Sequence, residues 1–144
     1  MRRRIVALLT RLLTKPLRTY EQRIPNSLAS LKEHLCVGDV ILVEGDQRVS
    51  QVIRYLTQSS WSHTALYIGD ELRRFQPALA DSLLAVHGGE ARHLLIEATA
   101  EKGVACTPVS KYVSYNLRVC RPRALRRDQQ AGVVAQATCA RHQA

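Results

Sequence analysis

Five short segments rich in Val, Ile and Leu constrain the fold of this 144-residue chain more than any other feature. Their lengths and compositions are typical of β-strands, and Lys102-Gly103 predicts a turn between the third segment and the fourth. We expect the last three strands to follow one another as a meander. The five segments are residues 40–43, 64–68, 94–98, 104–107 and 117–120.

Helical patterns separate some of these segments. Ser27 is placed to cap a short helix that ends near Leu35, and apolar residues at helical spacing predict a helix over about 48–58. A third helical pattern runs from Leu125 to the last residue. Charged residues, Pro77 and Gly88-Gly89 interrupt residues 71–93, which we interpret as a long loop with about one helical turn. The whole pattern predicts an α+β fold, with helices packed against an antiparallel sheet.

Basic residues are concentrated at the two ends of the chain, whose net charge is +9. Residues 1–23 hold seven Lys and Arg against one acid, and residues 118–144 hold six against one. Residues 24–117 hold eight basic residues against ten acidic ones. A nucleic-acid-binding module would carry basic and stacking aromatic residues on its folded body, so we expect no nucleic-acid partner.

The first 23 residues predict a basic amphipathic helix ahead of the main domain, residues 24–144. Its apolar residues fall on one helical stripe, and Pro16 is expected to end or kink the helix. The helix could dock on the protein or a partner, or lie on an anionic membrane, and the sequence does not decide between these. The stripe consists of Ile5, Leu8, Leu9, Leu12 and Leu13.

The same apolar run is short and is interrupted by Arg11, which argues against a cleavable signal peptide. The chain also offers no run of about 20 apolar residues that could span a bilayer. We therefore expect a cytoplasmic protein or one peripheral to the inner membrane. The four cysteines include no CxxC pair, so no zinc site is predicted, nor any other metal or cofactor.

His63 and Glu97 are the candidate catalytic pair. A thiol or hydroxyl nucleophile needs an imidazole to accept its proton and a third polar group to orient that imidazole. Both residues lie in or beside predicted strands, which hold side chains rigidly, and Glu97 lies in an apolar run where a buried carboxylate would need partners. We interpret the other four histidines as surface residues and Trp61 and Tyr67 as core or pocket wall. Those histidines are His34, His87, His93 and His142.

Several motifs over about residues 35–125 resemble the permuted papain-like NlpC/P60 cysteine hydrolases of the YiiX/YebB-like group. They are Gly38-Asp39-Val40-Ile41-Leu42-Val43-Glu44-Gly45, Trp61-Ser62-His63, Ile96-Glu97-Ala98, Val109-Ser110-Lys111-Tyr112 and Arg118-Val119-Cys120-Arg121-Pro122. The resemblance implies a circularly permuted papain-like fold, in which the histidine strand precedes the helix that bears the catalytic cysteine. It also implies that His63 is the catalytic histidine and that Glu97 orients it.

In that family a Cys-Ser-like motif follows the last strand, and no such motif is present here. Cys139 does not fit that role, since it falls inside the last predicted helix. We therefore expect a domain that is incomplete at its carboxyl end, through a natural stop, a frameshift or an engineered end, and that is inactive by itself.

The activity implied for the family is thiol hydrolysis of an amide or ester, with a cell-wall peptide or a lipid-like acyl group as substrate. The alternative is a non-catalytic module that binds a membrane surface or a partner through residues 1–23.

Overall fold

The computed structural model describes residues 15–16, 20–99, 103–123 and 127–140. The apolar stripe of the expected amino-terminal helix and His142 therefore lie outside the described residues. Among the described helices, none has the length and apolar composition needed to cross a bilayer.

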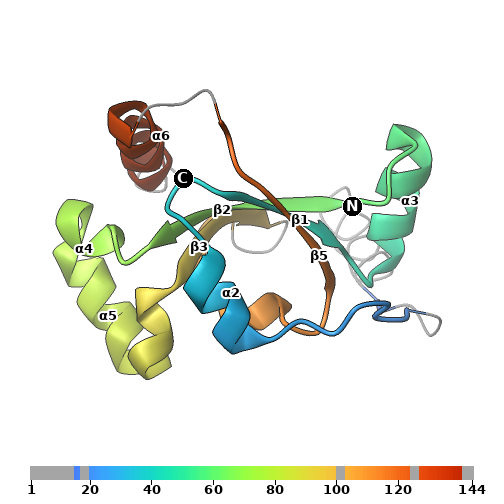
Figure 1. Ribbon diagram of the computed structural model, residues 1–144, viewed down its shortest axis with the longest axis horizontal. Coiled ribbons are helices and arrows are strands. Elements are labelled where there is room, and N and C mark those ends of the chain that lie inside the picture. The colour runs from blue at the N-terminus through green and yellow to red at the C-terminus, as the bar shows by residue number, and fades with distance from the viewer. Residues whose placement is uncertain (1–14, 17–19, 100–102, 124–126, 141–144) are drawn as a thin grey trace, which may run out of the picture.

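A five-stranded antiparallel sheet forms the centre of the molecule (Figure 1). The strand order is β4-β3-β2-β1-β5. All five predicted strands are confirmed, with boundaries within one residue of those expected. Their bounds are β1 Val40–Glu44, β2 His63–Gly69, β3 Leu94–Thr99, β4 Gly103–Pro108 and β5 Asn116–Cys120.

The expected meander is only partly correct. β3 and β4 pair as a hairpin, but β5 pairs with β1 at the opposite edge of the sheet, where Cys120 lies opposite Val40. A 3-10 helix, η2 (Val109–Tyr112), follows β4, and Val109 and Tyr112 are buried in the cluster on the sheet face. Because these two side chains pack on the sheet, the chain crosses the face and reaches the free edge of β1.

The predicted helices before β1 and after β1 are present as α2 (Leu28–His34) and α3 (Arg48–Thr57). The Ser27 hydroxyl accepts a hydrogen bond from the Ser30 N–H, which is the expected amino-terminal cap of α2. The last pattern forms α6 (Arg127–Ala140).

Residues 71–93 are largely helical, so their interpretation as a loop was wrong. They form α4 (Leu72–Phe75), α5 (Pro77–His87) and the 3-10 helix η1 (Gly88–Arg92). Pro77 occupies the first turn of α5, where a missing N–H costs no helical hydrogen bond. Gly88, at φ +56°, follows the last residue of α5. The residues that appeared to interrupt a helix therefore mark its two ends.

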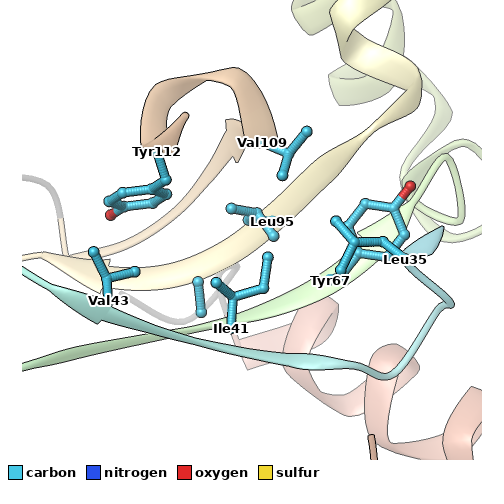
Figure 2. Packing of buried hydrophobic residues seen from close by; sticks show 8 residues of the cluster. Leu35, Ile41, Val43, Tyr67, Leu95, Val109 and Tyr112 are labelled. Atoms are coloured by element: carbon cyan, nitrogen blue, oxygen red, sulfur yellow. The ribbon is translucent and has the colours of Figure 1, made fainter. Parts of the chain in front are cut away.

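Two apolar clusters cover the two faces of the sheet. Figure 2 shows buried residues of the first, in which Leu35, after α2, and Val109 and Tyr112 of η2 pack over β1, β2 and β3. The second contains buried residues of β2, β3 and β4 with α4, α5 and α6. Leu95 belongs to the first cluster and its neighbours Leu94 and Ile96 to the second, so β3 is buried on both faces. This explains why residues 94–96 are continuously apolar rather than alternating.

The buried carboxylate of Asp39 joins α2, β1 and the end of β5. It accepts hydrogen bonds from Arg121 at 2.9 and 2.8 Å and from the Cys36 N–H at 2.8 Å, while Arg121 also donates to the His34 carbonyl. Burial raises the pKa of Asp39, but the Arg121 and Cys36 hydrogen bonds outweigh it and leave the pKa below its usual range. Asp39 and Arg121 therefore support the fold rather than the candidate site.

Candidate functional site

His63 and Glu97 lie on the same face of the sheet. Glu97 is directly opposite Ala65 in the β2–β3 ladder, and His63 precedes Ala65 by two residues. Since residues two apart along a strand share a face, the two side chains are diagonal neighbours. His63 Nε2 is 2.7 Å from Glu97 Oε2. The expectation that they come within hydrogen-bond distance is confirmed.

The Glu97 side chain is fully buried and holds four hydrogen-bond partners. His63 and the Tyr112 hydroxyl bond to Oε2. The Thr107 hydroxyl and Lys111 Nζ each bond to Oε1 at 2.6 Å. Leaving a buried carboxylate unpaired would be costly, and here both oxygens are satisfied.

These contacts keep Glu97 ionised. Burial raises the pKa of Glu97, but the hydrogen bonds from His63, Lys111, Thr107 and Tyr112 outweigh that effect and hold the pKa far below its usual range. Burial, followed by the hydrogen bond to Glu97 and its charge, raises the pKa of Tyr112 well above normal. Tyr112 therefore stays protonated and donates a hydrogen bond to the carboxylate.

The ionised carboxylate determines which nitrogen of His63 can act as a base. A carboxylate only accepts hydrogen bonds, so Nε2 of His63 must carry the proton that points at Glu97. In the neutral ring the lone pair then lies on Nδ1. The His63 side chain is 26% exposed, which leaves the ring accessible to a substrate or a nucleophile.

Three partners of Glu97 were not identified from the sequence: Thr107, Lys111 and Tyr112. Thr107 lies opposite Leu95 in the β3–β4 hairpin and is therefore a diagonal neighbour of Glu97 on the same face. The hairpin itself was predicted, so register alone could have found Thr107. Lys111 and Tyr112 reach Glu97 because η2 folds back over the sheet, which no local pattern indicates.

Gly45 allows α3 to pack tightly beside the start of β2. Its N–H donates to the Ser62 hydroxyl at 2.9 Å, and the Ser62 N–H donates to the Val43 carbonyl at 3.1 Å. A Cβ atom on Gly45 would lie 2.4 Å from the Ser50 hydroxyl oxygen and 3.0 Å from that of Ser62. This close contact fixes the residue that immediately precedes His63.

No thiol that the structure describes lies at His63. Cys106 lies opposite Ile96 in the β3–β4 ladder, and its side chain belongs to the cluster on the opposite face from Glu97. Cys120 lies opposite Val40 at the far edge of the sheet, and Cys36 is exposed after α2. Cys139 falls in the last turn of α6, and its side chain is outside the described part. Across the same described residues, no group of three His, Cys, Asp or Glu side chains could hold a metal ion.

The remaining histidines and aromatic residues follow the expectations in part. His34 is exposed and Tyr67 is a core residue, both as predicted. The assignment of His87 and His93 to the surface was wrong, because both are half-buried, and His93 Nδ1 is 2.9 Å from the Tyr67 hydroxyl. Burial, aided by Lys32 and Arg92, lowers the pKa of His93.

Comparison with models of known protein families identifies the family of this chain. The model of a family described as "permuted papain-like amidase enzyme, YaeF/YiiX, C92 family" matches residues 34–141. That range contains His63, Glu97 and every side chain that bonds to Glu97. No curated protein and no solved structure shows significant similarity to the chain.

Proposed function

The chain belongs to the permuted papain-like amidase family, and we propose that His63 and Glu97 serve thiol-dependent hydrolysis of an amide or ester. His63 is the general base and Glu97 is its positioning residue. The contact between His63 Nε2 and a buried, ionised Glu97 carries this proposal, since it leaves Nδ1 as the proton-accepting atom.

The reaction follows from that arrangement. Nδ1 takes the proton of a cysteine thiol, and the thiolate attacks the carbonyl carbon of the substrate. The Glu97 carboxylate stabilises the imidazolium, which returns its proton to the departing amine or alcohol and leaves a thioester. Nδ1 then takes a proton from water, whose oxygen attacks the thioester, and the imidazolium returns that proton to the departing cysteine sulfur.

The nucleophile in this proposal is not one of Cys36, Cys106 or Cys120, because none of these thiols lies near His63. We propose a cysteine in the first turn of a helix that faces Nδ1, where the helix dipole and the imidazolium would both stabilise the thiolate. The family resemblance supports cell-wall peptides or lipid-like acyl groups as substrates.

The test is a thiol-dependent amidase and esterase assay on two proteins: the 144-residue chain, and the same chain fused to a cysteine-bearing helix from another family member. We expect turnover only from the fusion, and we expect His63→Ala to abolish it. Glu97→Ala should reduce kcat strongly, and His34→Ala, which changes an exposed histidine of α2, should leave it unchanged.

Three results would contradict the proposal. If the fusion remains active after His63→Ala, His63 is not the general base. Activity of the unfused chain that is lost on Cys139→Ser would identify a different nucleophile. A fusion that folds but never turns over would favour the second candidate, a non-catalytic module, which the lack of a described thiol at His63 already supports.

A further inference from the structure

The outer face of α3 exposes large apolar side chains. Figure 1 shows α3 beyond the end of the sheet, and Ser50 is its one buried residue. Val52, Tyr55 and Leu56 are 48%, 77% and 73% exposed. Their spacing of three and four residues places them on one side of the helix, where they form a continuous apolar stripe rather than scattered exposures. We call these three residues the α3 face.

Two exposed basic residues, Lys15 and Arg48, lie at the start of α3. No acidic residue lies in α3, its first residue Arg48 is exposed, and Arg54 is paired with Glu44. Exposed Lys15 lies beside the first turn, because its carbonyl accepts the Arg48 N–H at 3.1 Å. Pro16 also forms a bridge with Gln47. These contacts hold Lys15 and Pro16 against the start of α3.

We propose that the α3 face, with Lys15 and Arg48 at its rim, docks on the surface of an anionic lipid bilayer. Apolar side chains of an amphipathic helix enter the boundary between headgroups and acyl chains, where tyrosine is also well suited. Basic residues at the rim are attracted to anionic headgroups, and each contributes about a fivefold gain in partitioning near such a surface. In the sequence, residues 1–23 hold seven Lys and Arg, Lys15 among them, against one acid.

Charge disfavours the main alternative occupant, the leucine stripe of residues 5–13. That segment is accompanied by Arg2, Arg3, Arg4 and Arg11, so docking it on α3 would bring basic residues beside Arg48 and Lys15. Like charges at such a contact repel one another. An anionic bilayer instead complements both elements at once.

The experiment measures flotation of the full chain with vesicles of phosphatidylcholine alone and with vesicles that also contain phosphatidylserine. Trp61 is the single tryptophan and follows α3 closely, so its emission gives a second readout. We expect binding at least tenfold stronger to the anionic vesicles, and weakened by added salt. The double substitution Tyr55→Gln with Leu56→Gln should reduce partitioning about tenfold. The matched control is Val86→Gln on α5, since Val86 is 74% exposed and should have no effect.

Each other result overturns the proposal. Equal binding to both vesicle types, or no binding at low salt, would show that an anionic bilayer is not the partner of the α3 face. Wild-type binding by a folded double variant shows that the α3 face is not used. A marked fall in Tm of the double variant without lipid shows that protein, such as the leucine stripe, covers the face. Circular dichroism of each variant excludes misfolding as the cause of lost binding.

Discussion

Replacing Glu97 by Gln tests whether the buried carboxylate supports the fold through its charge. The side chain keeps its size, but one oxygen becomes an NH2 group that cannot accept a hydrogen bond. His63 and Tyr112 bond to one oxygen, and Thr107 and Lys111 to the other. The amide nitrogen fits best toward Thr107, whose hydroxyl can rotate to accept, while Lys111 would turn to solvent.

The expected cost of Glu97→Gln is about 2–4 kcal/mol at pH 7. Two charge-assisted hydrogen bonds are lost or weakened, at about 1.5–3 kcal/mol each. The Lys111 side chain is 41% exposed, so its contribution is discounted for solvent screening. The hydrogen bonds to His63 and Tyr112 remain, although without the full charge.

The cost should depend on pH in a defined direction. Because the pKa of Glu97 is lower in the folded protein than its unfolded value of about 4.3, the carboxylate stabilises the fold above that pH. That stability is lost as pH falls toward the folded pKa. Glu97→Gln has no such group, so the difference between the two proteins should shrink steadily below about pH 4. Asp39 has the same sign of shift but is present in both proteins and cancels.

The measurement is urea unfolding at pH 7, 5, 4 and 3, followed by Trp61 fluorescence and circular dichroism. Glu33→Gln on α2 is the matched control, because this exposed glutamate should change stability by less than about 0.5 kcal/mol. A cost for Glu97→Gln below about 1 kcal/mol at pH 7, or one that stays constant to pH 3, would show that the charge of Glu97 does not stabilise the fold.

Three further substitutions have defined outcomes in the same unfolding assay. Tyr112→Phe removes one donor to Glu97 and should cost about 1–2 kcal/mol with the fold retained, as judged by NMR spectra. Gly45→Ala should cost about 1–3 kcal/mol, because its Cβ would lie 2.4 Å from the Ser50 hydroxyl, and Ser50→Ala should recover part of that loss. Leu95→Ala should cost about 2–5 kcal/mol, since Leu95 is fully buried, whereas exposed Val86→Ala should have little effect.

Local patterns were sufficient to predict the five strands and three of the helices. Strand composition and helical spacing are properties of neighbouring residues, so they can be identified without knowledge of packing. The segment over residues 71–93 shows the limit of this approach. Pro77 and Gly88 can interrupt a helix or bound one, and only the packing of Leu72 and Ala80 on the sheet determines which occurs.

The candidate pair could be predicted, but its surroundings could not. His63 and Glu97 follow from residue chemistry and strand placement, and their contact needs only the pairing of β2 with β3. The contacts of Lys111 and Tyr112 with Glu97 require η2 to fold back across the sheet. The crossing of β5 to β1 arises in the same way, because burial of Val109 and Tyr112 decides the path of the chain after β4.

The four donors around Glu97 have an evolutionary consequence. A member of this family that ceased to catalyse hydrolysis would still be selected to keep this glutamate, because substituting it would leave the buried hydroxyl of Tyr112 and the half-buried hydroxyl of Thr107 without their acceptor. His63 is less constrained, since its ring is partly open to solvent and makes one of the four contacts. Among relatives, substitution of the histidine with retention of the glutamate would therefore indicate lost activity more readily than substitution of the glutamate.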